Sequence, residues 1–139
     1  MPQDISGYDV GALLYCPANA HHTVAQAVAA ERLPRPFSLA LCLEDTVRAD
    51  ALAAAEQAVE QTLHDLTDAA RQETFYRPLT FVRVRSPEQL ARLGRAYGKY
   101  RPLLTGFILP KFFMETCGAY CAVIRDLQAD GLDYFYMPV

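Results

Sequence analysis

Five short apolar runs recur along the chain, and most of them end at a proline or at an acidic pair. The runs are continuous rather than alternating, which is typical of strands that are covered on both faces of a parallel sheet. The pattern predicts strands at about residues 11–16, 38–43, 79–84, 106–109 and 133–137.

Amphipathic segments lie between these runs, and their apolar residues follow helical spacing. We expect helices within residues 23–33, 52–66, 86–97 and 120–127. Ser86 followed by Pro87 is a strong helix start, and Gly131 is placed to end the last helix. Only 68–78 is expected to be a long loop. This alternation of strand and helix leaves two architectures, an open doubly wound sheet or a (β/α)8 barrel.

Composition narrows the class of protein but does not give the function. The chain has 139 residues, 52% of them hydrophobic, and a formal net charge of −3, which fits one soluble domain over residues 1–139. Mild acidity gives no electrostatic reason to expect nucleic acid or an anionic membrane as a partner. The chain begins without a secretory signal, and its four cysteines lie mostly in apolar segments. We expect reduced, buried cysteines in a cytoplasmic protein.

Charged side chains follow or end three of the predicted strands. Glu44 and Asp45 come after the second strand, Arg83 lies near the end of the third, and Lys111 follows the fourth. In either architecture function gathers at the carboxyl ends of the strands, so we expect these residues to meet on one rim. Such a set suits a carboxylate-bearing substrate held by arginine, with a divalent cation or its waters held by the acids.

Each of these residues also has a structural explanation. The acidic pair could cap the next helix, Lys111 could lie on a surface loop, and Arg85 could be solvated at the strand end. Arg83 is the hardest to explain structurally, because an unpaired charge inside a hydrophobic strand is very costly. The chain has no GxGxxG, phosphate-loop or GxSxG motif, so acid, base and metal chemistry is favoured over nucleophilic catalysis.

Five segments together resemble the citrate lyase β-subunit and HpcH/HpaI aldolase superfamily. They are LLYCPANA (13–20), LALCLEDTV (39–47), FVRVRSPEQL (81–90), GFILPKF (106–112) and DYFYMPV (133–139). The LED and RVR segments are most similar to the carbon–carbon bond lyase branch associated with tellurite-resistance gene clusters. The resemblance implies an α/β fold that forms the N-terminal five-strand, four-helix portion of a TIM (β/α)8 barrel.

The resemblance also implies an activity. It is Mg²⁺-assisted retro-aldol or retro-Claisen cleavage of a carboxylate-bearing hydroxyacid or its CoA thioester, in a protein that forms a homo-oligomer. Carried over by position, Arg83 binds the substrate carboxylate or enolate oxygen, and Lys111 supports the rim. Glu44 and Asp45 sit beside the metal and hold its waters. Cys42 and Arg85 depart from the family pattern, which commonly has Asp and Asn there.

The family's direct metal ligands and last three strands correspond to positions beyond Val139, so we expect a truncated chain that is inactive alone. Such a chain is expected to expose two sheet edges and the apolar inner face of its strands. Two alternatives are a flavodoxin-like binding domain and a half-barrel that completes itself by dimerising. The first is disfavoured because the acids follow strand two and no helix follows strand five.

Overall fold

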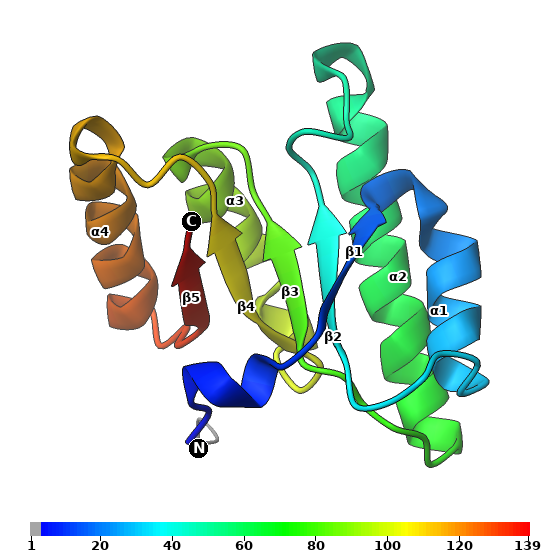
Figure 1. Cartoon of the computed structure of the whole chain (residues 1–139). Helices are drawn as coiled ribbons and strands as arrows, with labels where there is room; N and C mark the ends of the chain where they lie inside the picture. Colours follow the sequence, from blue (N-terminus) through cyan, green and yellow to red (C-terminus); the bar gives the residue numbers. More distant parts are fainter. Residues whose placement is uncertain (1–3) are drawn as a thin grey trace.

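Within residues 4–139, which the computed structural model describes apart from the side chains of His21 and His22, the apolar runs form one parallel sheet (Figure 1). Its strands are β1 (Leu13–Pro17), β2 (Ser38–Cys42), β3 (Thr80–Arg83), β4 (Leu104–Leu109) and β5 (Phe135–Pro138). These bounds differ from the predicted ones by at most two residues.

Strands that are neighbours in sequence are also neighbours in the sheet, in the order β1-β2-β3-β4-β5, and every pair is parallel. A flavodoxin-like sheet has the order 2-1-3-4-5, whereas a barrel wall adds its strands in sequence. The topology therefore excludes the flavodoxin-like alternative and agrees with the predicted portion of a TIM barrel.

The helices pack against one face of the sheet (Figure 1). They are α1 (His21–Ala29), α2 (Leu52–Gln72), α3 (Pro87–Ala96) and α4 (Met114–Ala129), with 3₁₀ turns η1 (Gly7–Val10), η2 (Ala18–Ala20), η3 (Ala49–Ala51) and η4 (Gly98–Tyr100). The predicted caps are confirmed, because the Ser86 side chain accepts a 3.2 Å hydrogen bond from Gln89 N and Gly131 has a φ of +75°. The expected loop at 68–78 is confirmed for residues 73–78 but is wrong for 68–72, which are helical. Helix α2 continues to Gln72 because the Ala-Ala-Arg-Gln segment consists of good helix formers.

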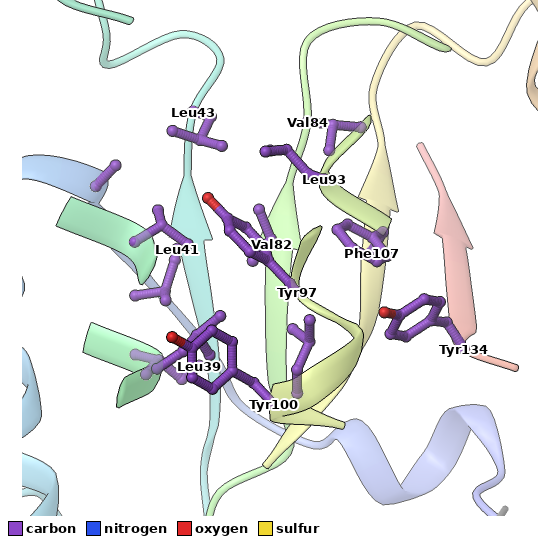
Figure 2. Close-up of a cluster of buried hydrophobic side chains, with 14 of the residues drawn as sticks. Leu39, Leu41, Leu43, Val82, Val84, Leu93, Tyr97, Tyr100, Phe107 and Tyr134 are labelled. Atoms are coloured by element: carbon purple, nitrogen blue, oxygen red, sulfur yellow. The ribbon is translucent and has the colours of Figure 1, made fainter. Parts of the chain in front are cut away.

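The main core lies between the sheet and the helices (Figure 2). Leu39 and Leu41 of β2 point to the helices, and Tyr97 and Tyr100 cover them and the neighbouring strands (Figure 2). All four are at most 6% exposed. Burying an apolar side chain of this size contributes about 1.5–3 kcal/mol, so this layer fixes the strands that position the rim.

The opposite face of the sheet carries a second, smaller core. Ala40, Phe81 and Ile108 are each 0% exposed, and Val10 of η1 packs against them. The expectation that the apolar inner face would be exposed is therefore wrong for the central strands. The reason is that η1 folds back beneath the sheet, where the Ser38 hydroxyl donates a 2.6 Å hydrogen bond to the carbonyl oxygen of Val10.

Two further findings concern the cysteines and the hydrophobicity of the helices. The four cysteines are free, but only Cys42 is buried, so the expected burial is wrong for the other three. No helix in the described part of the chain is long and apolar enough to cross a membrane.

Candidate active site

The loops that follow β2, β3 and β4 lie at the same end of the sheet (Figure 1). Glu44 and Asp45 stand just after β2, Arg83 is the last residue of β3, and Lys111 comes two residues after β4. The sheet register pairs Cys42 with Arg83, which brings the acidic loop to the end of the neighbouring strand. All four predicted site residues are thus gathered on one rim.

Three ion pairs join these residues. Arg83 Nη2 lies 3.0 Å from Glu44 Oε2 and 3.4 Å from Asp45 Oδ2, and Lys111 Nζ lies 3.3 Å from Glu44 Oε1. We call these four residues the rim cluster. The alternative that the acids cap the next helix is wrong, because η3 and α2 are preceded by Arg48 and Ala51 and neither helix receives a side-chain cap.

Glu44 is the buried centre of the rim cluster. Its side chain is 7% exposed, whereas those of Asp45 and Lys111 are 68% and 70% exposed. Among the described residues, Glu44 Oε2 and Arg83 Nε are buried atoms without an aligned hydrogen-bond partner. Glu44 Oε2 keeps its 3.0 Å ion pair with Arg83, so of these two atoms Arg83 Nε is the unmatched one, and an unmatched buried donor is costly.

Lys111 is held in a conformation that lysine rarely adopts. Its φ is +53°, in the left-handed region, which costs a residue with a Cβ about 1–2 kcal/mol. Its carbonyl oxygen accepts hydrogen bonds from Phe113 N and from the Thr116 hydroxyl, and the Tyr120 hydroxyl donates to the carbonyl of Pro110. Burial, together with the negative charge of Glu44, raises the pKa of the Tyr120 hydroxyl, which therefore stays a donor. These contacts aim the lysine at the acidic loop.

One rim residue was misread by sequence reasoning, and another was missed. Arg85 is not simply solvated, because its Nη1 donates a 3.1 Å hydrogen bond to the carbonyl oxygen of Val47 and so ties the acidic loop to β3. The Tyr15 ring lies under the guanidinium of Arg83, with 5.7 Å between Cζ and the ring centroid. Alternation along β1 could have placed Tyr15 on the inner face, but its approach to Arg83 depends on the sheet register.

The described part of the chain contains no group of three or more His, Cys, Asp or Glu side chains that could hold a metal ion. The rim cluster offers two carboxylates, and Glu44 already has two cationic partners. By themselves these side chains do not make a complete site for Mg²⁺, which usually takes carboxylates together with waters and substrate oxygens.

The sheet has the strand order of a β/α-barrel wall. The rim cluster lies at the carboxyl ends of the strands, which is where active sites lie in this fold. The sequence model of a family described as C–C bond lyase of the TIM-barrel fold matches residues 4–139, so the chain belongs to this family of carbon–carbon bond lyases. A search of curated proteins found no match.

Proposed function

We propose that the rim cluster binds the substrate of a retro-aldol or retro-Claisen cleavage, acting on a carboxylate-bearing hydroxyacid or its CoA thioester. One observation carries the proposal. A buried carboxylate, Glu44, fixes two cations, Arg83 and Lys111, at the carboxyl end of a barrel sheet in a lyase family. Cations held in this way are suited to the negative charge that a breaking carbon–carbon bond leaves behind.

The reaction requires a base and a place for negative charge. A base takes the proton of the substrate hydroxyl, the carbon–carbon bond breaks, and its electron pair forms an enolate that later takes a proton at carbon. Asp45 is the better placed base, because it is 68% exposed and has one long contact with Arg83. Glu44 has two ion pairs and serves to orient Arg83 and Lys111, which stabilise the enolate.

Mg²⁺ belongs to the proposal as the source of additional positive charge at the enolate. Glu44 and Asp45 would hold its waters, and its direct ligands would come from outside the described residues. The relationship to citrate lyase β-subunits, the tellurite-resistance link, a cytoplasmic setting and homo-oligomerisation remain predictions.

The test uses the purified 139-residue chain and, separately, any longer product of the same gene. Each is incubated with Mg²⁺ and either a free hydroxyacid or a 3-hydroxyacyl-CoA that keeps a second, free carboxylate, and the carbonyl and acyl products are separated by chromatography. We expect cleavage only where the metal ligands are also present, and its loss in Arg83→Lys. Cleavage by the 139-residue chain alone contradicts the proposal that the direct metal ligands come from outside the described residues. If neither protein cleaves any of these compounds, the lyase proposal is wrong.

A further inference from the structure

Arg83 has two carboxylate partners that differ sharply in burial. Glu44 lies 3.0 Å from Nη2 with a side chain that is 7% exposed, and Asp45 lies 3.4 Å from the same nitrogen with a side chain that is 68% exposed. An exposed ion pair is weak because solvent screens it and the side chain loses freedom, whereas a buried charge is costly to leave unpaired. Of the two contacts, the one with Asp45 is therefore the easier to exchange.

The other sides of the guanidinium are shielded from solvent. The Tyr15 ring covers one face at 5.7 Å, and Nε is buried within the described structure. Arg83 therefore keeps two neighbours besides Asp45: the Glu44 carboxylate at 3.0 Å and the Tyr15 ring under the guanidinium. Arginine presents parallel N–H groups to a carboxylate, so an incoming carboxylate competes for the contact that Asp45 makes.

We propose that Asp45 is an exchangeable partner of Arg83, displaced by the carboxylate of the substrate while Glu44 and Tyr15 keep the guanidinium in place. The inference rests on the proposed function in that a carboxylate is taken as the ligand of Arg83. Once released, the Asp45 oxygen is free to accept the proton of the substrate hydroxyl. A neutral compound leaves Asp45 bound to Arg83, so the exchange makes a free carboxylate a requirement for the reaction.

Substitution of Asp45, the candidate base, tests the exchange. Asp45→Asn removes the competing charge, so carboxylate binding should become tighter even though the proton acceptor is lost. Exposed ion pairs of this kind correspond to about a two- to fivefold change in Kd.

The experiment is an NMR titration of the ¹⁵N-labelled 139-residue chain with 3-hydroxybutyrate, followed at the Arg83 side chain. The neutral probe is 3-hydroxybutyramide. Asp50→Asn is the matched control, because Asp50 is 69% exposed, also pairs with an arginine, and lies in the same connection between β2 and α2. Asp45→Glu keeps the charge and should leave the Kd within about twofold of the wild-type value.

We expect tighter 3-hydroxybutyrate binding in Asp45→Asn, a smaller effect in Asp50→Asn and no measurable effect on the amide. Equal tightening in both Asn variants means that only net charge matters and overturns the exchange. Unchanged or weaker binding in Asp45→Asn overturns it as well. Because the readout is binding, carboxylate exchange without cleavage by any product of the gene would remove the proposed function and leave this inference standing.

Discussion

Gly106→Ala probes the close approach of β4 and β5 at the strand that leads to Lys111. A Cβ built on Gly106 lies 1.7 Å from the carbonyl oxygen and 2.6 Å from the carbonyl carbon of Phe135. Backbone atoms cannot rotate away, so β5 has to move. Its displacement breaks the hydrogen bonds of 3.0 and 3.1 Å that join Val139 to Leu109 and to Phe112.

The magnitude follows from what β5 contributes. Inserting a methyl group into a packed region costs about 1–3 kcal/mol, and separating the edge-to-face pair of Phe81 and Phe135 adds about 0.5–1.5 kcal/mol. The ring centroids of that pair are 6.0 Å apart. We expect Gly106→Ala to lower the free energy of unfolding by about 3 kcal/mol, measured by urea denaturation.

Gly118→Ala is the matched control for this substitution. Gly118 is exposed within α4, and a Cβ built there meets nothing within 4 Å. Alanine is about 0.5–1 kcal/mol better than glycine in a helix interior, so this variant should be more stable than the wild type. If Gly106→Ala unfolds within about 0.5 kcal/mol of the wild type, β5 does not pack as described and the argument is refuted.

Three further predictions concern the rim, acid stability and assembly. Lys111→Gly should be about 1 kcal/mol more stable to urea than Lys111→Ala, because glycine has no Cβ and so avoids the steric penalty at a φ of +53°; equal stability contradicts this. The Arg92 hydrogen bond holds the pKa of Glu56 below its usual 4.5, so its stabilising effect is present above about pH 4.5 and disappears as the pH falls through the folded-state pKa. The midpoint temperature of thermal unfolding should therefore decrease less steeply below that pH in Glu56→Gln than in the wild type. Parallel curves of midpoint temperature against pH would contradict this. If the chain forms a homo-oligomer through β1, Leu14→Lys at this exposed edge should shift its gel-filtration peak toward the monomer, whereas an already monomeric wild type rules the assembly out.

The elements that could be predicted from the sequence are those with a strong local signal. Continuous apolar runs gave the strands, and Ser86 with Pro87 gave the start of α3, since both signals depend on neighbouring residues. The end of α2 was missed because Asp68 and Arg71 are compatible with either a loop or a solvated helix surface. In the structure, Arg71 donates a hydrogen bond to Asp68 within the last turns of that helix.

The candidate site was predictable in its members but not in its contacts. Residues at the carboxyl ends of parallel strands must share one edge, so Glu44, Arg83 and Lys111 could be grouped from the sequence. Which carboxylate is buried, and which backbone carbonyl Arg85 binds, depends on loop conformation and register. The burial of the inner face likewise depends on Val10, a residue with no pattern that marks it as part of a core.

Charge balance links the proposed carboxylate substrate to the proposed cation at this rim. Glu44 and Asp45 carry two negative charges, and Arg83 and Lys111 carry two positive ones, so the cluster is neutral before a ligand arrives. A substrate carboxylate adds one negative charge, and proton transfer to Asp45 then moves a second negative charge from that side chain onto the enolate, beside a carboxylate that is 7% exposed. Uncompensated charge is costly in such surroundings, and displacing Asp45 only moves one negative charge outward without removing it. We therefore expect the rim cluster to recognise the carboxylate, while the charge that develops when the bond breaks requires a further cation such as Mg²⁺.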